Sequence, residues 1–166
     1  MADITYRDLR PDDLEDLTTL VLHWPVVRQL GSWPWPPDPA LTESRCKPFA
    51  GDGFVWAICR DDRLIGTVGV TQGDLGYMLI PAQQGQGIMV RAACTAVDHA
   101  FATQDRDVIT GSSWYDNPAS YRILQRLGFQ HWQTRYVRSK ARGVPTLVHH
   151  LRLTRATWER LRSGSD

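Results

Sequence analysis

The sequence has few cysteines and lacks any long run of apolar residues. Its 166 residues include three cysteines, Cys46, Cys59 and Cys94, and no two of them form a CxxC pair. This usage argues against a disulfide-stabilised scaffold and predicts reduced, buried thiols, which are typical of cytoplasmic proteins. A membrane span needs about 20 consecutive apolar residues, and the opening MADITYRDLR lacks the apolar centre of a signal peptide. We therefore expect a cytoplasmic protein with no membrane partner.

An excess of charge of either sign is also absent. The chain has 19 Lys and Arg against 18 Asp and Glu, which argues against direct nucleic-acid binding. His149 and His150 would point to opposite faces of a strand, and no motif has the spacing of metal ligands, so we expect no metal. With 42% hydrophobic residues, the chain can bury one core, and we expect a single domain over residues 1–166. A homodimer is compatible with the sequence, which carries no direct sign of one.

The most informative stretch is Gly76–Phe101, GYMLIPAQQGQGIMVRAACTAVDHAF. Its apolar run from Tyr77 to Ile80 predicts a buried strand, which Pro81 ends because proline has no backbone N–H to donate. After a polar loop, the apolar residues change to helical spacing and predict an amphipathic helix with a small-residue face. This face consists of Ile88, Met89, Ala92, Ala93, Ala96, Val97, Ala100 and Phe101.

The order strand, glycine loop, helix predicts an anion site. The first N–H groups of a helix lack intrahelical partners, and the helix dipole adds about half a positive charge there. Gly85 and Gly87 would let a phosphate approach the backbone without an intervening Cβ. A turn between a strand and a helix can also need glycine for its backbone geometry alone, without binding a phosphate. The spacing here is neither that of the phosphate loop of nucleotide hydrolases nor that of the three-glycine dinucleotide fingerprint. The expected ligand is a cofactor that carries a diphosphate.

Alternation, turn residues and helical spacing predict the remaining elements. A first strand from Ile4 to Leu9 precedes a helix over residues 14–21, and Thr42 is expected to cap a short helix that reaches Phe49. Further strands are expected at residues 54–59, 64–70, 108–114, 129–138 and 146–153, with helices at 118–127 and 154–161. Strands with helices on both faces predict an α+β, or three-layer α/β, domain.

A second motif, NPASYRILQRLGF at residues 117–129, follows the strand expected at 108–114. With this motif and the glycine loop, the chain resembles the GNAT family of N-acetyltransferases. The family's Q/R-x-x-G-x-G/A loop is similar to residues 84–89, QGQGIM, where Met89 stands in place of the usual small residue. The resemblance is greatest to the RimJ/RimL-like branch, which acetylates ribosomal-protein N-termini and shares Gly-Tyr-x-Leu, Asn-x-x-Ser and Leu-Gly-Phe elements: Gly76, Tyr77, Leu79, Asn117, Ser120, Leu127, Gly128 and Phe129.

The resemblance covers most of the chain in element order. It implies a mixed, mostly antiparallel sheet of about seven strands flanked by helices, with acetyl-CoA as cosubstrate. The residues that it implies for coenzyme A binding are Met78, Leu79, Gln84, Gly85, Gln86, Gly87, Ile88, Met89 and Asn117. Asn117 can instead cap a helix that begins at Pro118, and both roles can hold at once.

Acetyl transfer to an amine requires a polarised carbonyl, a deprotonated amine and a proton for the departing thiolate. The resemblance implies that the backbone N–H of Leu79 faces the thioester oxygen. Many family members place a tyrosine seven residues after the asparagine, but Leu124 stands there, so the proton donor implied is Ser120, with an ordinary helix serine as the alternative. Asp74 is the candidate that orients or deprotonates the amine, although an unperturbed aspartate, with a pKa of about 3.9, is a weak base at neutral pH.

The acceptor is the least determined part of the function. Trp33, Trp35 and Tyr77 are candidates for substrate contacts, while the tryptophans could equally cover the sheet. Acetylation of a protein or peptide N-terminal α-amine is favoured. The alternatives are acetylation of a small amine, such as an amino acid, polyamine or antibiotic, and a non-catalytic coenzyme A-binding module, which Met89 and Leu124 motivate.

Overall fold

The computed structural model describes residues 3–164. Seven strands form one sheet in the order β1-β2-β3-β4-β5-β7-β6. All neighbouring strands are antiparallel except β4 and β5, which are parallel. The strands are β1 Ile4–Asp8, β2 Gly53–Arg60, β3 Arg63–Thr71, β4 Asp74–Leu79, β5 Val108–Trp114, β6 Gln130–Arg138 and β7 Pro145–Thr154. The mixed, mostly antiparallel sheet is confirmed.

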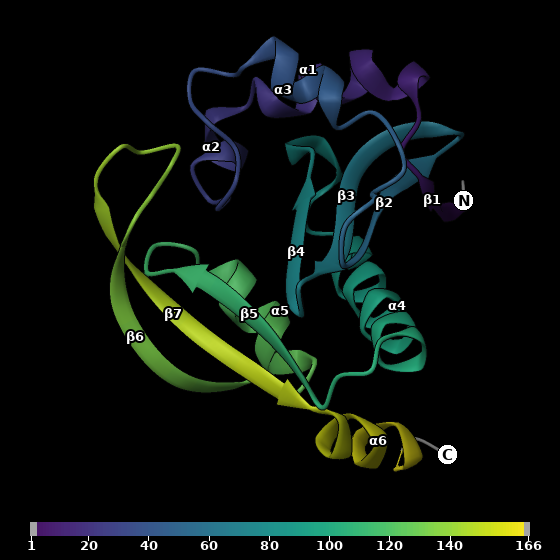
Figure 1. The fold of residues 1–166 in the computed structure, drawn as a ribbon, viewed down its shortest axis with the longest axis vertical. Coiled ribbons are helices and arrows are strands. Elements are labelled where there is room, and N and C mark those ends of the chain that lie inside the picture. Colours follow the sequence, from purple (N-terminus) through teal and green to yellow (C-terminus); the bar gives the residue numbers. More distant parts are fainter. Residues whose placement is uncertain (1–2, 165–166) are drawn as a thin grey trace.

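Helices cover both faces of the sheet and make three layers (Figure 1). One core lies between the sheet and α4, α5 and α6, and a second lies between the sheet and α1 to α3. The helices are α1 Leu14–Val21, α2 Trp24–Val27, α3 Pro39–Ser44, α4 Ile88–Thr103, α5 Pro118–Arg126 and α6 Arg155–Ser163, with short 3-10 helices η1 Pro11–Asp13 and η2 Pro81–Gln83. None of the helices within residues 3–164 is long and apolar enough to cross a membrane.

Helix α4 packs its small-residue face against the sheet, as its periodicity predicts. All eight residues of that face are buried. Alanines at four of these positions let the helix approach β3 and β4 closely. Close packing places the start of α4 directly after the end of β4.

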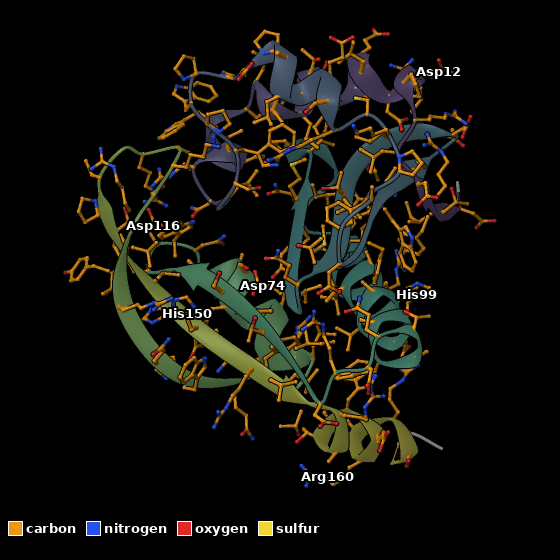
Figure 2. The ribbon with its side chains drawn as sticks, viewed as in Figure 1. Asp12, Asp74, His99, Asp116, His150 and Arg160 are labelled. Atoms are coloured by element: carbon orange, nitrogen blue, oxygen red, sulfur yellow. The ribbon has the colours of Figure 1, made fainter. Side chains whose placement is uncertain are left out.

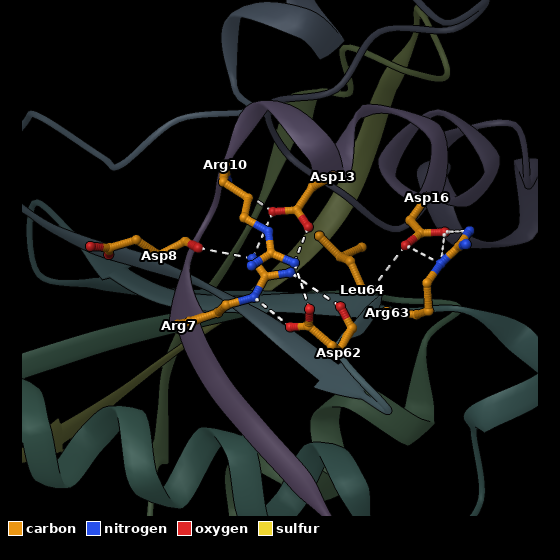
Figure 3. Close-up of polar contacts among 8 residues, drawn as sticks. All are labelled: Arg7, Asp8, Arg10, Asp13, Asp16, Asp62, Arg63 and Leu64. Carbon is orange, nitrogen blue, oxygen red and sulfur yellow. Dashed lines mark hydrogen bonds and ion pairs between the residues drawn. The ribbon is translucent and has the colours of Figure 1, made fainter.

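The turn between β2 and β3 helps to fix the N-terminal helices. Asp61 and Asp62 both have positive φ angles, 50° and 61°, as a two-residue hairpin turn of this type requires. Arg7 on β1 binds both carboxylate oxygens of Asp13 at 2.7 and 2.8 Å and also contacts Asp62 (Figure 3). The carboxylate of Asp16 accepts from the backbone N–H of Leu64 at 3.1 Å. These contacts join α1 to the edge of the sheet.

The helix expected from Thr42 to Phe49 is wrong in its position. Helix α3 covers Pro39–Ser44, and the Asp38 carboxylate caps it by accepting from the N–H groups of Ala40 and Leu41 at 3.0 and 3.2 Å. An aspartate followed by proline is the stronger start signal, since proline at the first helical position has no N–H to leave unpaired. The early end of α3 leaves residues 45–50 free to line a cavity.

Candidate active site

Strands β4 and β5 separate soon after they begin. Their register pairs Asp74 with Thr110 and Leu75 with Gly111, and no further pair joins them within the described residues. Strand β5 remains paired with β7 from Val108 to Trp114, so the opening lies on its β4 side. Figure 1 shows the two strands diverging from a common start.

Backbone groups of β4 face this opening. In an antiparallel ladder, alternate residues direct their backbone groups to opposite neighbours. Ile80 donates its N–H to the Ile65 carbonyl of β3 at 2.8 Å, so Leu79 and Tyr77 direct theirs towards β5. The N–H of Leu79 therefore points into the space between the separated strands.

The loop before α4 has the geometry of a phosphate site. Gly85 and Gly87 have φ angles of 76° and 72°, and a Cβ added at either would meet no heavy atom within 4 Å. Helix α4 begins without a side-chain cap, so the N–H groups of its first turn are available to an anion. Gln84 donates from Nε2 to the Leu79 carbonyl at 2.9 Å, which ties the loop to the end of β4. Open space, glycine backbone and an uncapped helix start fit the diphosphate of coenzyme A.

Met89 does not occupy the loop. Its side chain is buried in the core between α4 and the sheet. The replacement of a small residue by methionine therefore leaves the glycine backbone open.

The first turn of α5 lies beside β4. Asn117 accepts at Oδ1 from the backbone N–H of Ser120 at 3.1 Å and caps the helix that begins at Pro118. The Ser120 hydroxyl is buried and lies 2.7 Å from the hydroxyl of Tyr77. Burial raises the pKa of Tyr77 to about 12, although the hydrogen bond with Ser120 opposes the rise. Leu124, where many family members have tyrosine, is buried in the core.

Asp74 lies on the opposite face of β4 from Tyr77. Its carboxylate accepts from Thr110 Oγ1 at 2.7 Å, and Figure 2 shows it between β4 and β5. Solvent reaches Asp74, but the walls of the cleft surround it, and this desolvation raises the pKa of its carboxyl against the opposing hydrogen bond from Thr110. A raised pKa makes Asp74 a better proton acceptor near neutral pH than an ordinary aspartate.

A cavity of about 730 Å³ opens on this face of β4. Its floor includes the paired Gly69 and Gly76, and a Cβ added at Gly76 would meet no heavy atom within 4 Å. Trp33 is buried in its wall, and Tyr77 borders the cavity although its side chain packs against the core on the other face of the sheet. Trp35 is 37% exposed and stacks on Trp24 with 5.2 Å between ring centroids, so it is not part of this wall.

The charges of the cavity are few and segregated. Asp74 on β4 is the one carboxylate in the described lining of the cavity. The segment after α3 contributes two cations to the lining, Arg45 and Lys47. Arg45 lies over the ring of Trp33, with its guanidinium carbon 4.1 Å from the ring centroid. Arg45 was not predicted from the sequence, because nothing in its spacing distinguishes it from a surface arginine.

Two further structural arrangements were not predicted from the sequence. The Gly69–Gly76 floor could have been found, because the two-residue turn Gln72–Gly73 fixes the register three pairs away. The ion cluster of Asp116 with Arg28 and Arg142 could not, since its members are far apart in the chain.

The described residues contain no group of three or more His, Cys, Asp or Glu side chains that could hold a metal ion.

A family model, the acetyltransferase (GNAT) domain, matches residues 3–130 of the chain. The chain belongs to the GNAT family. The family consists of acetyltransferases that take the acetyl group from acetyl-CoA. The chain shares 38% identity over 77 residues with the "Probable N-acetyltransferase YjcK" of Bacillus subtilis (strain 168), a match that spans 42% of each protein.

Solved structures share the GNAT fold at low sequence identity. A structure described as RimL, a ribosomal L7/L12 alpha-N-protein acetyltransferase in complex with coenzyme A, is 18% identical, with a TM-score of 0.75 over 93% of this chain and 95% of that one. The structure of AAC(6')-Ib with ribostamycin and coenzyme A is 17% identical, with a TM-score of 0.77 over 98% and 99%. At such identities the likeness establishes the fold alone.

Proposed function

We propose that this GNAT enzyme, within a single domain, acetylates the N-terminal α-amine of a protein or peptide. The observation that carries the proposal is the charge of the acceptor cavity: among the described residues that line it, Asp74 is the one carboxylate and Arg45 and Lys47 are cationic. Polyamines and aminoglycosides carry several positive charges and need several carboxylates for binding. A cavity with two cations and one carboxylate favours an acceptor with a single amine.

Coenzyme A would be held by the loop and by the opening between β4 and β5. The diphosphate would accept from the N–H groups at the start of α4, over Gly85 and Gly87. Leu79 would present its backbone groups to the cofactor's arm, whereas the backbone groups of Met78 face Thr67 of β3. Asn117 uses its amide oxygen to cap α5, which leaves its amide nitrogen as a donor to the same arm.

Acetyl-CoA supplies the acetyl group in activated form, as a thioester. The N–H of Leu79 would donate to the thioester oxygen as negative charge develops on it. Asp74 would attract the acceptor ammonium and take up its proton, directly or through a water.

Ser120 would hold a proton at Oγ for the leaving sulfur. An alkyl hydroxyl alone is a very weak acid, but the Tyr77 hydroxyl lies 2.7 Å away and can return a proton to Ser120. Even with its pKa raised to about 12 by burial, the Tyr77 phenol is a stronger acid than an alkyl hydroxyl. The pair thus offers an acidic group where the family tyrosine is replaced by Leu124.

Free-thiol release from acetyl-CoA, measured across N-terminal peptides, free amino acids, spermidine and an aminoglycoside, tests this proposal. Turnover on peptides at a kcat/KM at least about tenfold above that on the polycations is the expected result. Turnover confined to small amines would reject the N-terminal acceptor. Calorimetric binding of coenzyme A without turnover on any amine would instead support a binding module.

A further inference from the structure

Arg45 is held in a fixed orientation in the wall of the acceptor cavity. Its guanidinium lies 4.1 Å from the ring centroid of Trp33, which is itself buried. Arg45 also donates to the Ser32 hydroxyl and carbonyl at 3.3 and 3.1 Å. The indole ring covers one face of the guanidinium and Ser32 covers one edge, so N–H donors on another edge remain for a ligand.

The described part of the chain gives Arg45 no counter-ion. Two other partly buried arginines are paired with carboxylates, Arg7 with Asp13 and Arg142 with Asp116. None of the ion pairs within residues 3–164 involves Arg45. Burial lowers the pKa of Arg45, and no carboxylate opposes this effect. A partly desolvated cation without an anion is unfavourable, and a ligand anion would relieve that cost.

The cavity therefore has two oppositely charged sides. Asp74 stands on β4, and Arg45 and the exposed Lys47 stand on the segment after α3. An acceptor that complements both sides carries an amine at one end and an anion further along. A planar guanidinium matches a carboxylate better than an ammonium does, because it donates two parallel hydrogen bonds.

We propose that Arg45, supported by Trp33, binds a carboxylate of the acceptor, so that the enzyme prefers peptides with Asp or Glu among their first residues. This specificity rests on the N-terminal acceptor proposed above. Lys47, which is exposed, adds a weaker, salt-sensitive attraction.

The test compares matched peptides that differ by Glu or Gln at the second or third residue. Rates are measured for the wild type and for Arg45→Gln, Arg45→Lys and Lys47→Gln. The wild type should prefer the better-placed Glu peptide by about tenfold in kcat/KM, the effect of one charge-assisted contact. Arg45→Gln should reduce that ratio to about one. Arg45→Lys should retain part of the preference, and Lys47→Gln most of it.

Binding provides a readout that does not depend on turnover. Calorimetry with the peptides alone should show the same Glu-over-Gln preference in the wild type and its loss in Arg45→Gln. Thermal melting of each variant establishes that it is folded before its preference is interpreted.

Equal kcat/KM values for Glu and Gln peptides in the wild type, or a preference that survives Arg45→Gln, would overturn the carboxylate site while leaving N-terminal acetylation intact. Arg45-dependent turnover of free amino acids, with none on peptides, would support the carboxylate site through the α-carboxylate and reject the peptide acceptor. Faster turnover of polyamines than of any peptide would overturn both.

Discussion

The hydroxyl of Tyr77 lies 2.7 Å from Oγ of Ser120 and links the central strand β4 to the first turn of α5. Both side chains are largely enclosed, so their hydroxyls hydrogen-bond to each other where water is scarce. We expect Tyr77→Phe and Ser120→Ala each to lower kcat about tenfold or more, because each removes a member of the proton-donating pair.

The double variant distinguishes a joint role from two separate ones. Since the hydroxyls act as a unit, Tyr77→Phe with Ser120→Ala should be no slower than the slower single variant. Coenzyme A affinity, measured by calorimetry, should stay within about twofold of the wild type in all three. A wild-type rate for Ser120→Ala would show that Ser120 is not the donor.

Asp74 is expected to serve activity at the expense of stability. Its folded-state pKa is raised by desolvation, so its stabilising contribution is present below the unfolded pKa and is lost as pH rises through the folded one. At neutral pH, Asp74→Asn should therefore melt no lower than the wild type while kcat/KM falls by about tenfold or more. Asp61→Asn, at an exposed turn position with a φ of 50°, is the matched control and should change neither.

The hydrogen bond from Thr110 tunes the same carboxyl. Thr110 lowers the pKa of Asp74, so Thr110→Val should raise that pKa further. The acid limb of the kcat/KM profile should then move to higher pH, and an unmoved limb would exclude Asp74 as the titrating base.

Gly76 keeps the floor of the acceptor cavity open. An added Cβ there meets open space, unlike at the paired Gly69, where it would lie 2.3 Å from the Phe54 carbonyl oxygen. Gly76→Val should therefore leave melting and coenzyme A binding nearly unchanged, since valine suits a strand. The KM for the peptide acceptor should rise about tenfold as the side chain fills the cavity. Unchanged kinetics would place the acceptor elsewhere.

Gly87 determines whether an anion can approach the start of α4. Gly87→Glu should weaken coenzyme A binding at least about 100-fold by calorimetry, because it places a carboxylate where the diphosphate is proposed to lie. The Gly87→Gln variant has the same added bulk and left-handed backbone strain as Gly87→Glu but no added charge. It should therefore bind coenzyme A more tightly than Gly87→Glu does. Gly143→Glu adds the same charge at another open glycine with a φ of 72° and should bind as the wild type does.

Asp116 joins α2 to the turn between β6 and β7. Arg142 binds both of its carboxylate oxygens at 2.8 Å, Arg28 contacts it as well, and these partners lower its pKa to about 2. A lowered pKa contributes stability that is present above the unfolded value of about 4 and is lost as pH falls towards 2. Asp116→Asn should therefore reduce the free energy of unfolding by about 1–2 kcal/mol at pH 7, after allowance for partial exposure.

Denaturant unfolding at several pH values checks this prediction. The difference between wild type and Asp116→Asn should shrink as pH falls from 5 towards 2. Asp62 forms an exposed ion pair with Arg10, so Asp62→Asn should reduce the free energy of unfolding by less than Asp116→Asn does. A constant difference across the range would mean that the carboxylate charge is not what stabilises the junction.

Local signals in the sequence were sufficient for most elements. The eight-residue apolar face of α4, the Asp61–Asp62 turn and Pro118 after Asn117 each place an element through nearest-neighbour physics. The helix expected at Thr42 failed because a competing local signal, Asp38 before Pro39, started it earlier. The error concerns where the helix begins and ends, because competing signals for a helix start can lie within a few residues of each other.

The sequence by itself determined the order of elements, the glycine loop at the start of α4 and membership of the acetyltransferase family, because backbone requirements and short motifs are encoded within a few neighbouring residues. Only the tertiary structure decided that Tyr77 meets Ser120, and that Arg45 lines the acceptor cavity with no counter-ion among the described residues. Tyr77 and Ser120 are 43 positions apart in the sequence. Arg45 and Asp74 come from different elements and line the same cavity. These relations depend on how the layers pack and where β4 and β5 separate, which no local pattern specifies.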